Sequence, residues 1–83
     1  MTWKFLTSGT EHDQTRLGDV AVWAHVWHAV PGCKATVVDP HYGQAFTFSV
    51  YRIHAASRVL EFAAGEFSNG VWGFYLEESG CAR

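Results

Sequence analysis

Hydrophobic and polar residues alternate at the start of the chain, as expected for a strand with one face toward a core. Over residues 2–7, one side of an extended backbone carries Trp3, Phe5 and Thr7. Residues 8–18, which follow, are mostly polar and contain two glycines. They predict a long loop after the first strand.

The segment 20–30 is rich in valine and also holds two tryptophans, and both residue types favour β-strands. Pro31 and Gly32 follow it directly and are a turn signal. We therefore expect a second strand over 20–30 and a third over 34–39. Residues 39–43 then predict the next turn.

Both faces of the predicted strand 20–30 are apolar. Valines dominate one face, whereas the other carries Trp23, His25 and Trp27. A small single-layer sheet buries only one face of such a strand. The second face is therefore expected either to be covered by the 8–18 loop or by a helix, or to be a contact surface, since exposed apolar patches commonly mark partner or ligand sites. Trp23, His25 and Trp27 are the candidate interface or ligand-contact residues.

Residues 44–53 alternate cleanly at first, because Phe46, Phe48 and Val50 fall on one face. Tyr51 and Ile53 then place apolar side chains on the opposite face. This slip predicts either a bulge near residues 50–52 or a strand that is covered on both sides at that end.

The dipeptide Asn69-Gly70 stands between two β-compatible stretches and is typical of a type I′ hairpin turn. With these two residues as the loop, the ladder is expected to pair Ser68 with Val71, Phe67 with Trp72, and Gly65 with Phe74. An aromatic ring then lies over a glycine. The alternative interpretation is a helix over 57–67 that ends at the same dipeptide.

These elements predict a single all-β domain over residues 1–83. Its expected architecture is an antiparallel meander of about six strands that forms a small barrel or a strongly bent sheet. The alternative is an α+β fold with the helix at 57–67.

Composition excludes several classes of partner. The chain has six Lys plus Arg against eight Asp plus Glu and a net charge of −2. It therefore offers no cationic surface for phosphates or anionic lipids, and neither nucleic acid nor a membrane is expected as a partner. The N-terminus lacks the pattern of a secretory signal, which favours the cytoplasm. Cys33 and Cys81 are accordingly interpreted as free thiols.

The histidines do not form a recognisable site. His25 and His28 are three residues apart, which places them on opposite faces of a strand. No paired Cys or His signature of zinc accompanies them, so neither a metal nor another cofactor is expected. Residues 11–13 and 41–42 put histidine beside a carboxylate or a phenol, but no nucleophile motif is present. Both clusters are interpreted as solvated surface.

Three classes of function remain open. The first is a non-catalytic interaction module that self-associates, as a dimer, through the face with Trp23, His25 and Trp27. The second is a binder of a small apolar or aromatic ligand, with the tryptophans lining a groove or barrel mouth. The third is a small enzyme that uses a histidine with a carboxylate, or a metal site in its place. The sequence favours a binding role over catalysis.

Overall fold

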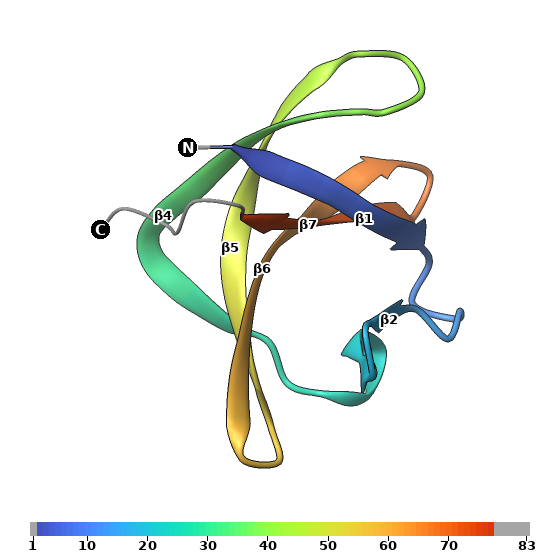
Figure 1. Cartoon of the computed structure of the whole chain (residues 1–83). Helices are drawn as coiled ribbons and strands as arrows, with labels where there is room; N and C mark the ends of the chain where they lie inside the picture. Colours follow the sequence, from blue (N-terminus) through green and yellow to red (C-terminus); the bar gives the residue numbers. More distant parts are fainter. Residues whose placement is uncertain (1, 78–83) are drawn as a thin grey trace.

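A computed structural model of the protein, which describes residues 2–77, consists almost entirely of β-strands (Figure 1). In chain order the elements are β1 (Trp3–Gly9), β2 (Arg16–Leu17), β3 (Val20–Ala21), the 3-10 helix η1 (Val22–Ala24), β4 (His28–Val38), β5 (Ala45–Ala55), β6 (Arg58–Ser68) and β7 (Val71–Glu77). All strand pairs are antiparallel. The all-β prediction is confirmed. The helical alternative is wrong, because residues 57–67 fall largely within β6.

The main sheet has five strands in the order β1-β7-β6-β5-β4, and β2 and β3 form a small separate hairpin. Strands β4 to β7 are a simple meander, to which β1 adds at the far edge. The sheet bends strongly, as the curved β4 in Figure 1 shows, but β1 and β4 remain its two outer strands and it does not close into a barrel. Within residues 2–77 there is no helix long and apolar enough to cross a membrane.

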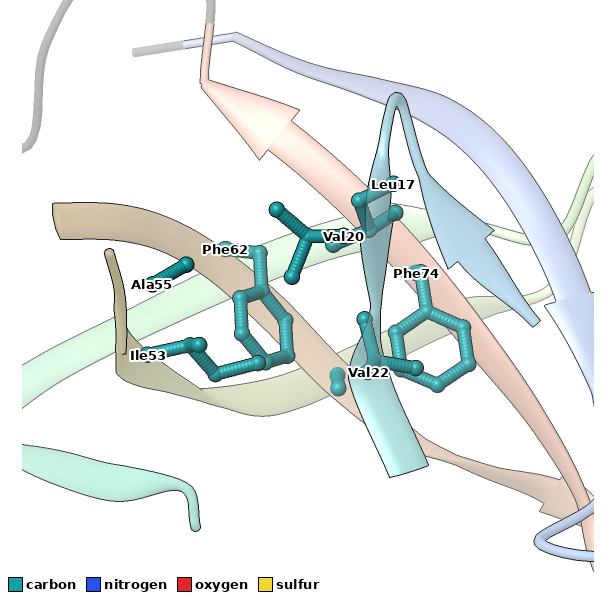
Figure 2. Packing of buried hydrophobic residues seen from close by; sticks show 8 residues of the cluster. Leu17, Val20, Val22, Ile53, Ala55, Phe62 and Phe74 are labelled. Carbon is teal, nitrogen blue, oxygen red and sulfur yellow. The ribbon is translucent and has the colours of Figure 1, made fainter. Parts of the chain in front are cut away.

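Each face of the sheet carries its own hydrophobic cluster. Cluster 1 (Figure 2) contains Leu17, Val20, Val22, Ile53, Ala55, Phe62, Ala64 and Phe74. Cluster 2, on the other face, contains Val30, Cys33, Ala35, Val37, Phe48, Val50, Ala63 and Tyr75. Neighbours in one strand belong to different clusters, as Phe62 and Ala63 do, because successive side chains of a strand point to opposite faces. Both faces of the central strands are therefore buried.

The slip in the pattern of β5 follows from this two-sided burial. Val50 is fully buried in cluster 2, and Ile53 is fully buried in cluster 1. The prediction of a strand covered on both sides is thus confirmed. The pairing of β5 with β6 runs without a shift from Ser49 to Ala55.

The irregularity lies instead in the neighbouring strand β4. Its register against β5 shifts between Ala29 and Lys34. Pro31 and Gly32 lie inside this shift, and Gly32 has a φ of 72°. The expected turn at these two residues is wrong: the strand continues through them as a local distortion. An outer strand tolerates proline because one of its edges needs no ladder hydrogen bond.

The predicted strand over 20–30 is also wrong. The segment instead contains β3 (Val20–Ala21), the 3-10 helix η1, an irregular stretch and the first residues of β4, which begins at His28. The irregular stretch is held by hydrogen bonds from its own side chains. The indole Nε1 of Trp27 donates to the Val22 carbonyl at 2.7 Å, and His25 Nδ1 lies 2.8 Å from the Ala21 carbonyl. This folded-back segment is itself the cover on cluster 1.

The hairpin of β6 and β7 is confirmed at its turn. Asn69 and Gly70 both have positive φ, 52° and 80°, as a type I′ turn requires. Ser68 pairs with Val71 as expected. The Glu66 carboxylate accepts the backbone N–H of Gly70 and closes the tip.

Beyond the turn, the register differs from the prediction by one residue. Phe67 is an extra residue in β6, so that Glu66 pairs with Trp72 and Gly65 with Gly73. A β-bulge shifts every later pair in this way, and it turns the Phe67 ring into cluster 2.

The directly paired glycines make room for two rings. A Cβ on Gly73 would lie 2.1 Å from Cζ of Phe67, and one on Gly65 would lie 2.2 Å from Cδ1 of Phe48. An aromatic ring over a glycine is therefore present, although neither ring is the predicted Phe74.

Cys33 is buried in β4 and is disulfide-bonded, so the free-thiol expectation is wrong at this position. Cys81 lies outside the described residues.

Candidate ligand site at the open end of the sheet

Three phenylalanine rings from three strands gather at one end of cluster 2. Phe5 comes from β1, Phe46 from β5 and Phe67 from β6, and all three are half-buried. The ring centroids of Phe46 and Phe67 are 5.4 Å apart. The period-2 pattern directs Phe5 and Phe46 to this face, and the bulge in β6 directs Phe67 there. The result is an aromatic surface that the fold leaves partly open.

The turn between β4 and β5 forms a polar rim above these rings. Its backbone is closed by the Asp39 N–H, which donates to the Gln44 carbonyl at 2.8 Å, and by the Gly43 N–H, which donates to the Asp39 carbonyl at 2.9 Å. The Asp39 carboxylate accepts the His41 backbone N–H at 2.8 Å. These bonds fix the turn, and they place the Tyr42 side chain, 88% exposed, at its tip.

A cavity of about 400 Å³ lies between the rings and the turn. Its lining residues are Phe5, Ser8, Asp39, His41, Tyr42, Gln44, Phe46, Phe67, Ser68 and Val71. This size and this combination of aromatic walls with a few polar groups are typical of small-molecule sites.

Tyr75 packs against two of the rings that line the cavity, with centroid distances of 5.5 Å to Phe5 and 6.5 Å to Phe67. Its side chain is almost fully buried, and its hydroxyl donates to the Val38 carbonyl at 2.7 Å, just before the turn. Burial and, to a smaller degree, the nearby Asp39 carboxylate raise the pKa of the Tyr75 phenol. The phenol therefore stays protonated at neutral pH, and its hydrogen bond links β7 to the end of β4, next to the β4–β5 turn.

The cavity combines aromatic walls with a few polar groups. The Asp39 carboxylate accepts a backbone N–H, so its role is to hold the turn. The residues that line the cavity carry phenyl rings, a phenol, an imidazole, hydroxyls, an amide, an isopropyl group and the Asp39 carboxylate.

Trp23, His25 and Trp27 lie close together but pack on the protein's own sheet. Trp27 contacts the rings of Trp23, Tyr51, Phe62, Trp72 and Phe74, with centroid distances from 4.9 to 5.7 Å. Both tryptophans are half-buried against cluster 1. The strand over 20–30 with two apolar faces, from which the interface was predicted, is absent. The contact of Trp23, His25 and Trp27 with a partner or ligand stays a prediction.

The other sequence clusters have local roles. Asp13 accepts the Thr10 N–H at 2.8 Å and closes a turn within the 8–18 loop. The rings of His25 and His28 do not pack against each other. The His28 ring instead packs against the ring of His54. Across residues 2–77 no group of three or more His, Cys, Asp or Glu is placed to hold a metal ion.

Sequence reasoning missed the phenylalanines as a site. Phe46 was assigned to a core face, and residues 41–42 were interpreted as solvated surface. The available signal was the short turn at 39–43, directly before an aromatic strand. What joins it to Phe5 and Phe67 is the sheet order and the bulge, which no local pattern shows.

Comparison with family models, with curated proteins and with solved structures finds no match for this chain. The inference about function therefore rests on the geometry of the site.

Proposed function

We propose that this domain is a non-catalytic binding module for a small, mostly apolar ligand with an aromatic ring, held at the open end of the sheet. The observation that carries the proposal is the cavity of about 400 Å³ between the half-buried Phe5, Phe46 and Phe67 and the hydrogen-bonded turn at 39–44. This is the ligand-binding alternative of the sequence analysis, with phenylalanines in place of the expected tryptophans.

Two features favour an aromatic ligand. Offset or edge-on pairs of aromatic rings contribute about 0.5–1.5 kcal/mol beyond their buried area. The exposed Tyr42 ring and the Phe46 ring line the same cavity and give such a ligand partners from the rim and from the wall. The turn is already held by its own hydrogen bonds, so little conformational entropy of the turn is lost when a ligand binds.

The test is a titration of the protein with indole, p-cresol and cyclohexanol, followed by amide chemical shifts. We expect the two aromatic probes to change the amide chemical shifts of residues 39–46, Phe67 and Val71. Tyr42→Ala is expected to weaken their binding about two- to tenfold, in line with the loss of one ring pair. Val59→Ala, an exposed position at the other end of the sheet, is the matched control. The absence of shifts at 39–46 contradicts the proposal.

Self-association through Trp23, His25 and Trp27 is the second candidate. It is supported by Val26, which lies between the half-buried tryptophans and is 72% exposed. An exposed valine beside indole edges is an apolar patch that a second copy of the chain would cover. Light scattering at high micromolar concentration tests it: a dimer that Val26→Lys converts to a folded monomer supports it, and a wild-type monomer contradicts it.

The cytoplasmic location also stays a proposal. The disulfide at Cys33 weighs against it, because stable disulfides are rare in reducing compartments. Alkylation of the thiols in freshly lysed cells, with and without a reductant, decides the matter. A thiol at Cys33 that reacts without reductant supports the cytoplasm.

A further inference from the structure

The rings of His28 and His54 meet on the surface of the sheet, far along β5 from the aromatic cavity. Their centroids are 5.3 Å apart and their planes are inclined by 77°. His28 is the first residue of β4, and His54 is the penultimate residue of β5. Both residues are exposed, so both imidazoles are accessible to solvent.

The distortion of β4 creates this pair. With the register that Lys34 and Ser49 set, a regular ladder would bring His28 opposite the buried Ala55. The shift between Ala29 and Lys34 instead pairs His28 with Arg52, two residues before His54 on β5. Residues i and j+2 of neighbouring strands share one face and are within reach of long side chains.

The charge around the pair is partly balanced. Arg52 lies directly opposite His28, and a cation there opposes the binding of a metal ion. Its guanidinium Nε is, however, 2.9 Å from the Glu61 carboxylate on β6. The ion pair draws the positive charge of Arg52 toward Glu61 and offsets it.

We propose that His28 and His54 form a two-imidazole binding site for a first-row transition metal ion, with Cu²⁺ bound more tightly than Zn²⁺. Imidazole nitrogens suit both ions, and the usual order of affinities places copper first. The remaining coordination positions are taken by water, so the site is labile and open. It is therefore distinct from a closed structural site, which is usually built from four protein ligands.

The test uses untagged protein and two metals. Zn²⁺ is titrated calorimetrically, and Cu²⁺ is followed by electron paramagnetic resonance, which counts the nitrogen ligands. We expect about one equivalent of each metal, with two nitrogen ligands on copper. His28→Ala and His54→Ala are each expected to weaken binding by at least about tenfold and to remove one nitrogen signal.

His12→Ala and His41→Ala are the matched controls, because both histidines are exposed and lie away from the pair. They are expected to leave both titrations unchanged. Thermal melting of every variant confirms that it is folded, which the exposure of all four positions favours. Metal binding that survives in the double variant at 28 and 54, or that is absent from the wild type, overturns the proposal.

Discussion

At the scale of single residues, backbone and ring positions are set by a few glycines. Gly65 and Gly73 pair directly across β6 and β7, and a phenylalanine ring fills the space above each of them. Because the ring occupies the position of a Cβ, the phenylalanine and the glycine must change together. The half-buried Phe67 of the cavity wall therefore depends on a residue of the neighbouring strand.

Gly73→Ala is expected to destabilise the protein by about 1–3 kcal/mol, the usual cost of overpacking. The cause is the contact with Phe67, so the same substitution in a Phe67→Ala background should cost much less. Denaturant unfolding of the two single variants and the double variant measures this coupling. Ser68→Ala, exposed on the same hairpin, is the control, and additive effects would contradict the explanation.

A substitution at Gly70 tests the effect of backbone conformation on stability without a steric contact. A Cβ there meets nothing within 4 Å, but the φ of 80° is one that L side chains rarely adopt. Gly70→Val is therefore expected to cost more than about 1 kcal/mol of unfolding free energy. Ser68→Val, next to the turn in extended backbone, should cost less. Equal and small effects would mean that the turn does not need positive φ at this position.

Tyr75 links stability to alkaline pH. Its pKa is raised above the ordinary 10.0, so the folded state holds the phenolic proton more tightly than the unfolded chain does. The resulting stability is complete below pH 10 and is lost as the pH rises through the folded-state pKa. Tyr75→Phe should flatten this alkaline loss and, at neutral pH, cost about 1 kcal/mol for the bond to Val38. Tyr42→Phe, at the exposed tip, should leave the pH profile unchanged.

At the scale of elements, the segment between β3 and β4 acts as a cover. Trp27 is the centre of the aromatic packing on cluster 1, whereas Val26 beside it points to solvent. The irregular backbone of the covering segment brings the rings of Trp23 and Trp27 together on cluster 1. A regular strand would also place residues 23 and 27 on one face, but it lacks the curled backbone that lets their rings stack 4.9 Å apart.

Trp27→Lys is expected to unfold the domain or to lower its stability by about 3 kcal/mol or more, since it removes a large ring and inserts a charge. Val26→Lys should leave stability within about 0.5 kcal/mol of the wild type. Thermal and denaturant unfolding compare the two variants. A folded, stable Trp27→Lys protein would show that the tryptophan is not part of the core.

The comparison of elements shows what local patterns determine. Alternation predicted β1 and β5, and Asn69-Gly70 predicted the last hairpin, because each signal lies within a few neighbouring residues. The bulge at Phe67 and the shift around Pro31 and Gly32 were missed. They are set by packing against other strands, and together they place one wall of the cavity and one histidine of the proposed metal site.

At the scale of the whole molecule, the sheet is open and has two outer strands. Open edges invite pairing with a second chain, and proline or local distortion at an edge prevents it. The outer strand β4 contains Pro31, and its register is distorted around this residue, so both protections are present there. Pro31→Thr is therefore expected to raise aggregation at high concentration, measured by light scattering over time. Pro40→Thr, in the adjacent turn, is the control and should leave aggregation unchanged.

The pairing of β1 with β7 joins the beginning and the end of the described chain. Among the strands of the sheet, β1 is synthesised first and its partner β7 last, so β1 cannot form this pairing until the other strands have been made. Contacts so distant in sequence also make folding slow, in the range of milliseconds to seconds for sheets of this kind. The Phe5 wall of the cavity is consequently among the last parts of the sheet to form, and the proposed ligand site is complete only once β7 has paired with β1.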